Sequence, residues 1–199
     1  GAGDDTLLGS ASDDSLDGGD GTDLVRQIAN ADQVLTDTSL TGLGTDSLAG
    51  IETAELTGGA SGNRLDASGF TVGGVTLDGG NGSDTLIGSA NDDSLDGGFG
   101  IDTVEQTVDG DQLLSDTHLL GRGLDELSGI EAAVLTGGPS ANRLDASAFS
   151  LGLVTLAGAA GDDTLVGSEL DDLLDGGDGN DLVEQSADVN QVLYDTQHR

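Results

Sequence analysis

The chain has 199 residues and a formal net charge of −33, with 38 acidic residues against five basic ones, all arginine. A chain this anionic is repelled by nucleic acid and by anionic lipid, so neither is expected as a partner. No apolar run approaches the roughly 18 residues of a membrane-spanning helix, so no membrane insertion is expected. The absence of Cys excludes disulfides and thiolate metal sites, and the absence of Lys excludes Schiff-base chemistry.

This composition is compatible with two kinds of protein. High charge with few aromatic residues is typical of intrinsic disorder. The same excess of carboxylates is also typical of an acidic protein that folds around cations. Because 35% of the residues are hydrophobic, the spacing of these residues decides between the two.

The sequence repeats with a period of 79 residues, as the recurring Gly-Gly pairs at 18–19, 97–98 and 176–177 show. The copies cover residues 1–78, 79–157 and 158–199, and the third copy is partial. The ends of the chain ignore the repeat boundaries, so we expect it to be a portion of a longer array. We expect residues 1–199 to form a single continuous β-roll.

Each 79-residue copy contains a shorter period of nine residues. Residues 79–105 spell GGNGSDTLI, GSANDDSLD and GGFGIDTVE, which is G-G-x-G-x-D-x-U-x with U a bulky aliphatic residue. The period continues in weaker form, with one shortened unit and with inserts at Thr36–Leu40 and Ala67–Gly69. We count 20 units, and the eighth position is Leu or Val in every one, including Val34. Nine residues are 2.5 helical turns, so this column would not stay on one face of a helix.

The nonapeptide predicts a glycine-rich turn followed by a short strand that points one aliphatic side chain inward. One unit cannot bury that side chain alone, but stacked units can. We therefore predict an all-β fold, a parallel β-roll or β-solenoid of about ten two-strand turns. Since eight units make one copy, each copy is expected to begin on the same side of the solenoid as the copy before it.

The motifs GGNGSDTLI, GGFGIDTVE, GGDGTDLVR and GGDGNDLVE resemble the calcium-binding nonapeptides of the RTX (repeats-in-toxin) family. The resemblance implies a parallel β-roll in which the first six residues of each unit form a Ca²⁺ loop and the last three form a strand. It also implies several bound Ca²⁺ ions, each held between the loops of consecutive turns.

Calcium prefers six to eight oxygen ligands, which carboxylates and inward-turned carbonyls can supply. Loops of consecutive turns on one side are 18 residues apart, and this spacing pairs Asp5 with Asp23, Asp84 with Asp102, and Asp163 with Asp181. The resemblance implies carbonyl ligands from Gly3, Gly82 and Gly161 in one loop and from Gly18, Gly97 and Gly176 in the next.

The same spacing on the opposite side pairs Asp14 with Asp32 and Asp93 with Asp111. Asp172 is a weaker candidate, because its partner at this spacing is Asn190. Asn63 and Asn142 could complete sites with Asp84 and Asp163, but with less charge. For Asp46 and Asp125, which keep the sixth position of weaker nonapeptides, we favour a solvated turn residue over a calcium ligand.

No catalytic constellation appears, so we expect no enzyme activity. The leading hypothesis is a calcium-binding structural segment of a secreted or cell-surface bacterial protein, of adhesin, surface-layer or extracellular filament type, that folds into a rod on binding Ca²⁺. Copies of itself or neighbouring repeats are its expected partners. The alternative is the C-terminal secretion and folding module of a type I exported enzyme or toxin. A polysaccharide epimerase or lyase is disfavoured, because its basic substrate groove is hard to build from five Arg.

Overall fold

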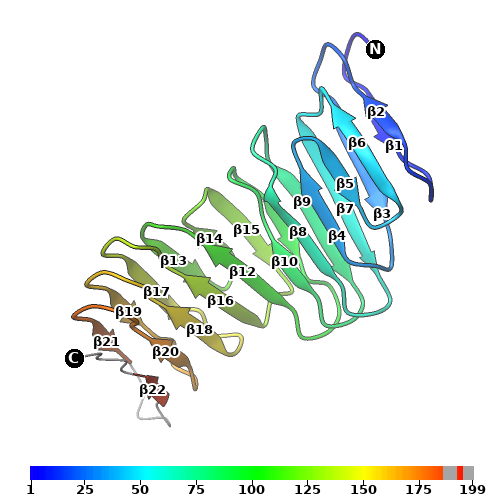
Figure 1. Ribbon diagram of the computed structural model, residues 1–199. Helices are drawn as coiled ribbons and strands as arrows, with labels where there is room; N and C mark the ends of the chain where they lie inside the picture. The colour runs from blue at the N-terminus through cyan, green and yellow to red at the C-terminus, as the bar shows by residue number, and fades with distance from the viewer. Residues whose placement is uncertain (186–191, 195–199) are drawn as a thin grey trace. The chain divides into compact units, whose positions relative to one another are not determined.

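The computed structural model describes residues 1–185 and 192–194, which form short β-strands joined by tight loops (Figure 1). The described residues contain no helix, and hence none that could span a membrane. The chain divides into two compact units, Gly1–Asp102 and Thr103–Arg199. Each unit is a two-sheet solenoid of mainly parallel strands, as predicted.

The strands of the first unit are β1 (Thr6–Leu8), β2 (Ser15–Asp17), β3 (Leu24–Ile28), β4 (Gln33–Thr36), β5 (Ser39–Thr41), β6 (Thr45–Ala49), β7 (Thr53–Gly59), β8 (Arg64–Gly69), β9 (Val75–Gly80), β10 (Thr85–Ile87) and β11 (Ser94–Asp96). Those of the second unit are β12 (Thr103–Thr107), β13 (Gln112–Ser115), β14 (His118–Leu120), β15 (Leu124–Ser128), β16 (Ala132–Thr136), β17 (Arg143–Ala148), β18 (Val154–Ala157), β19 (Thr164–Val166), β20 (Leu173–Asp175), β21 (Leu182–Glu184) and β22 (Val192–Tyr194).

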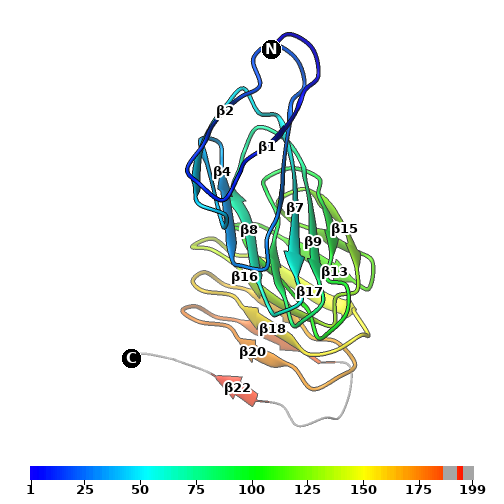
Figure 2. The same ribbon diagram turned by 90° about the vertical axis from the view of Figure 1, so that its right-hand side faces the viewer.

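In the first unit the strand orders of the two sheets are β1-β3-β7-β9-β11 and β2-β6-β5-β4-β8-β10. In the second unit they are β15-β14-β13-β17-β19-β21 and β12-β16-β18-β20-β22, and Figure 2 shows β16, β18 and β20 of this unit side by side. The register aligns the aliphatic column, since Leu7 pairs with Val25 and Leu77 with Leu95. Stacking of equivalent positions thus builds the narrow core that the nonapeptide predicted.

The five-residue insert departs from the parallel pattern. Residues 36–40 turn the chain back, so β5 pairs antiparallel with both β4 and β6. The second copy does the same with β13, β14 and β15. The expectation of wholly parallel sheets is therefore wrong here, because a strand that returns through a tight turn can only pair antiparallel.

The same insert overturns the expectation that each copy begins on the same side. The strands β1 and β10 occupy equivalent places in successive copies, yet they belong to different sheets of the first unit. In the second unit β12 and β21 are likewise equivalent and likewise lie in different sheets. The cause is that β4 and β6 lie in one sheet, so each copy makes an odd number of crossings between sheets.

The core consists of buried Leu, Val, Ile, Ala and two Phe side chains. The aliphatic column shifts by one residue beside the insert, where Val34 is 43% exposed and Leu35 is fully buried. A register irregularity in the β4–β8 pairing accompanies the shift. Gln33 turns inward there and donates to the carbonyl of Thr57 at 2.8 Å. Val34 was therefore wrongly assigned to the core.

The insert is also tied to the rest of its copy by hydrogen bonds. Asp37 Oδ1 accepts from the Thr71 N–H at 2.6 Å, and Asp37 Oδ2 accepts from the Thr71 hydroxyl at 2.8 Å. Asp116 and Ser150 repeat this pattern in the second copy at 2.6 and 2.8 Å. The excursion is thus a fixed part of the fold in both copies.

Candidate calcium sites

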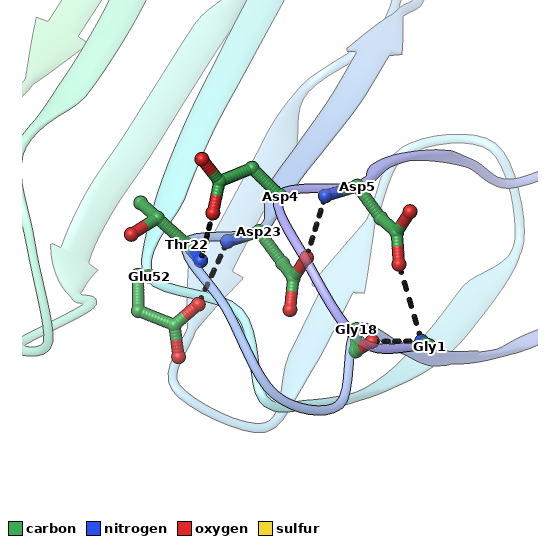
Figure 3. Close-up of polar contacts among 7 residues, drawn as sticks. All are labelled: Gly1, Asp4, Asp5, Gly18, Thr22, Asp23 and Glu52. Atoms are coloured by element: carbon green, nitrogen blue, oxygen red, sulfur yellow. Dashed lines mark hydrogen bonds and ion pairs between the residues drawn. The ribbon is translucent and has the colours of Figure 1, made fainter.

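The loops before β1 and β3 stack through their aspartates (Figure 3). The Asp5 N–H donates to Asp23 Oδ1 at 2.7 Å, and the Thr22 N–H donates to Asp4 Oδ1 at 2.9 Å. The Asp23 N–H in turn donates to Glu52 Oε2 at 2.8 Å, which links this loop to the next turn. One carboxylate from each turn therefore orients the loop beside it.

The structure repeats this contact in the other two copies of the strong nonapeptides. The Asp84 N–H donates to Asp102 Oδ1 at 2.7 Å, and the Asp163 N–H donates to Asp181 Oδ1 at 2.9 Å. All three pairs separated by 18 residues are thus brought together, as the spacing predicted. Asp5 precedes β1 and Asp84 precedes β10, and these two strands lie in different sheets of the first unit.

One carboxylate oxygen at each of these loops is buried and has no hydrogen-bond partner. These atoms are the Oδ2 atoms of Asp23, Asp84 and Asp163. A buried carboxylate oxygen without a partner is costly, because it has lost its hydration and gained nothing in exchange. Each of these oxygens is therefore positioned to accept a cation.

The glycine that opens each loop leaves space in front of the orphaned oxygen. A Cβ on Gly79 would lie 2.6 Å from both Asp84 Oδ2 and the carbonyl oxygen of Gly97. A Cβ on Gly158 would meet Asp163 Oδ2 and the Gly176 carbonyl in the same way. A carboxylate oxygen and a carbonyl oxygen of the next turn thus converge where a side chain is excluded, which is the kind of donor set that Ca²⁺ prefers.

Other predicted carbonyl ligands lie where the loops stack. The glycine at the fourth loop position, Gly21, has a φ of 145°, and a Cβ there would collide with the Gly3 carbonyl. Gly100 and Gly179 adopt the same backbone and pack on the carbonyls of Gly82 and Gly161. Only glycine permits so close an approach at such a φ. The Gly18 carbonyl accepts from the amino group of Gly1.

The electrostatics of these loops favour a cation. Burial raises the pKa of the Asp84 carboxyl above its ordinary value, and repulsion from Asp78 adds to the rise. The hydrogen bond from the Asn63 N–H acts in the opposite direction but is the smaller effect. Burial also raises the pKa of Asp163, to which Asp181, Asp162 and Asp109 add their repulsion. A raised carboxyl pKa means that the fold disfavours the anion, and a bound divalent ion would reverse this.

No group of three or more His, Cys, Asp or Glu side chains that could hold a metal is present within residues 1–185 and 192–194. Side chains alone therefore cannot complete the coordination of Ca²⁺ in this part of the chain. Backbone carbonyls must therefore supply the remaining oxygen ligands, as the nonapeptide loop implies. The convergence of carboxylate and carbonyl oxygens in front of Gly79 and Gly158 fits this requirement.

The opposite-side pairs differ from the expectation. The Asp14 N–H donates to Asp46 Oδ1 at 2.9 Å, so Asp46 and not Asp32 is the partner of Asp14. Asp32 is exposed and accepts from the Arg64 N–H at 2.9 Å. Asp111 is exposed and accepts from the Arg143 N–H at 2.8 Å. The hairpin excursion explains the difference, since it places a later strand beside β2.

The carboxylates of the middle loops are satisfied within their own turn by the serine at the second loop position. Asp14 Oδ2 and Asp93 Oδ2 each accept from the N–H of the serine four residues earlier at 2.6 Å, and so does Asp172 Oδ2. Asp93 and Asp172 also accept from the serine hydroxyls. The Oδ2 atoms of the middle loops therefore have hydrogen-bond partners, whereas those of Asp23, Asp84 and Asp163 have none. Asn190, the expected partner of Asp172, lies outside the described residues.

The Asn candidates take up the expected positions. The Asn63 N–H donates to Asp84 Oδ1 at 2.6 Å, and the Asn142 N–H donates to Asp163 Oδ1 at 2.7 Å. Glu52 was missed, because it lies in the shortened unit and has no aspartate register to mark it. Asp46 was undervalued, although its sixth position in TGLGTDSLA is the signal that marks it.

Comparison with known protein families agrees with this geometry. A model described as RTX calcium-binding nonapeptide repeat (4 copies) matches residues 1–26, 76–104 and 155–184. No relative among curated proteins matches the chain. These three segments are RTX-type calcium-binding nonapeptide repeats. The cofactor is Ca²⁺, bound as several ions, and the matched repeat is a structural rather than a catalytic element.

Proposed function

We propose that this segment is a calcium-stiffened structural element of a secreted or cell-surface bacterial protein, of adhesin, surface-layer or extracellular filament type. The observation that carries the proposal is the recurrence of one arrangement at Asp23, Asp84 and Asp163, each with a buried, unpartnered carboxylate oxygen facing a glycine-lined space. Ions at those places would join each turn to the next. The proposed ligands are the paired aspartates and glycine carbonyls of the strong loops.

Calcium concentration explains how such a segment could be exported and then folded. Extracellular calcium modules have Kd values of about 10⁻⁴–10⁻³ M, so their loops stay empty at cytosolic calcium levels. Repulsion within a chain of net charge −33 would then keep it extended and able to pass an export channel. Calcium outside the cell would fold it, and no disulfide would have to form, since the sequence has no Cys.

The alternation between sheets supports the rod. Each full copy contributes nine strands, four to one sheet and five to the other, because β5 adds a strand beside β4 and β6. Within each unit, equivalent strands of successive copies lie in different sheets, so the surplus strand is not tied to one sheet. We therefore propose that residues 1–199 form one continuous β-roll that further copies can extend.

A test is to measure molecules built from two, four and six 79-residue copies by electron microscopy in millimolar calcium. With an average of about 4.5 strands per sheet and about 4.8 Å per strand, each copy should lengthen the rod by roughly 20 Å. Compact particles of constant length would contradict the rod, as would a calcium-loaded folded form isolated from the cytosol. A hydrolase or pore-forming region in the same gene would instead support the secretion module of an exported enzyme or toxin.

A further inference from the structure

Asp46 is a buried carboxylate that the 18-residue spacing does not explain. Its side chain belongs to β6 and is 1% exposed. Its Oδ1 atom accepts from the Asp14 N–H at 2.9 Å, whereas Oδ2 is buried and has no hydrogen-bond partner. The unpartnered oxygen faces Gly9, where a Cβ would collide with it.

Asp46 shares its backbone hydrogen bonds with Asp23, since each accepts from the N–H of the aspartate in the earlier loop, but its orphaned oxygen faces Gly9 of that earlier loop and not the opening glycine of its own. The strand that contains Asp46 and the strand that follows Asp23 each pair in parallel with the strand of the earlier loop, β6 with β2 and β3 with β1. The Thr45 N–H donates to Asp13 Oδ1 at 2.9 Å, just as the Thr22 N–H donates to Asp4 Oδ1 at 2.9 Å.

The loop backbones are stacked alike as well. Gly44 has a φ of 85°, and a Cβ there would lie 3.0 Å from the carbonyl oxygen of Ser12. Gly21 packs on the carbonyl of Gly3 in the equivalent place. The loop that ends at Asp46 and the loop that ends at Asp14 are therefore stacked like the loops of a strong nonapeptide pair.

The hairpin excursion creates this neighbourhood. The strands β4 and β5 fold back on each other, so β6 reaches β2 although 32 residues separate Asp14 from Asp46. Asp32, which the regular spacing places beside Asp14, lies exposed before β4 and accepts from the Arg64 N–H instead. The strand β2 therefore pairs with β6, the strand of the fifth nonapeptide, and not with β4, the strand of the fourth.

We infer that Asp46 and the loop of residues 9–14 form a further site for a hard divalent cation of the calcium class. Asp46 Oδ2 supplies the charged oxygen, and the missing side chain of Gly9 leaves room beside it. The ion fastens β6 to β2 and so closes the antiparallel excursion at its base. This inference rests on the proposed calcium function and adds a site that joins turns across the insert.

The test counts bound calcium with calcium alone as the probe, by native mass spectrometry and isothermal titration calorimetry of the full chain. Asp46→Asn keeps the acceptor for the Asp14 N–H and removes the charge. It should bind one ion fewer than wild type, with the remaining ions and the β-type circular dichroism retained. Asp32→Asn is the matched control and should bind as many ions as wild type.

Each other outcome has a definite meaning. An unchanged ion count in Asp46→Asn overturns the inference, and so does loss of one ion in Asp32→Asn, which would restore the 18-residue pairing. A wild-type chain that binds no calcium overturns the proposed function itself, so the two failures are distinguishable.

A second variant covers the case in which Asp46→Asn does not fold. Gly9 lies outside the positive-φ glycines, so Gly9→Ala adds a methyl group against Asp46 Oδ2 without backbone strain. It should lose one ion. Gly110→Ala is its control, because a Cβ there meets nothing within 4 Å, and it should lose none. Full ion occupancy in folded Gly9→Ala would overturn the site.

Discussion

Removing calcium should unfold most of the solenoid. Without the ions, the buried Oδ2 atoms of Asp23, Asp84 and Asp163 remain unpaired, and a net charge of −33 repels itself. The core is too narrow to compensate, because each turn buries few aliphatic side chains against the entropy of its glycine-rich loops. Circular dichroism in excess chelator should therefore be that of a disordered chain, and millimolar calcium should restore the β spectrum.

The expected size of the effect supports this outcome. A site at a calcium concentration 100 times its Kd stabilises the fold by about 2.7 kcal/mol. Three such sites together supply about 8 kcal/mol, which is comparable with the whole stability of an ordinary domain, about 5–15 kcal/mol. Loss of all three ions should therefore move the folding equilibrium to the unfolded side.

Two controls separate calcium coordination from charge screening. Magnesium requires octahedral geometry and shorter bonds, so it should not replace calcium in loops built from carbonyls and carboxylates. Potassium chloride at matched ionic strength should screen the repulsion without filling the sites. A β spectrum that persists in excess chelator would refute calcium-linked folding. A β spectrum fully restored by potassium chloride alone would show that charge screening, and not calcium coordination, drives folding.

The strong nonapeptides were predictable because each carries its whole structure locally. Gly at the first, second and fourth positions, Asp at the sixth and an aliphatic residue at the eighth define loop, ligand and strand within nine residues. The contact between Asp84 and Asp102 followed from the spacing alone, because parallel strands stack equivalent positions. The orphaned oxygens could not be predicted, since they depend on which backbone donors reach each carboxylate.

The inserts were visible in the sequence, but their effect was not. Residues 36–40 could have looped out without changing the solenoid, and no local signal shows that they instead reverse the chain and form β5. That reversal moved the partner of Asp14 from Asp32 to Asp46, changed the sheet in which each copy begins, and exposed Val34. These three features depend on long-range strand pairing, which the nine-residue period does not encode.

Placing a charge in the core should be the most damaging single substitution. Leu95 is 1% exposed on β11 and pairs with Leu77 on β9. Leu95→Asp would bury a carboxylate with no partner in a core one side chain thick, at a cost of about 4 kcal/mol or more. Ser94→Asp adds the same charge on the exposed face of the same strand and should cost less than about 1 kcal/mol.

Denaturant unfolding in saturating calcium measures both variants, together with Asp84→Ala as a site variant. Contacts in a solenoid are made mainly between neighbouring turns, so Asp84→Ala should weaken one calcium site and leave distant turns folded. Leu95→Asp should instead lower the unfolding midpoint strongly at any calcium concentration, because no ion reaches the core. Equal destabilisation by Ser94→Asp and Leu95→Asp would show that added charge rather than burial is responsible. Complete unfolding of Asp84→Ala in saturating calcium would show that the sites act as one cooperative unit and not locally.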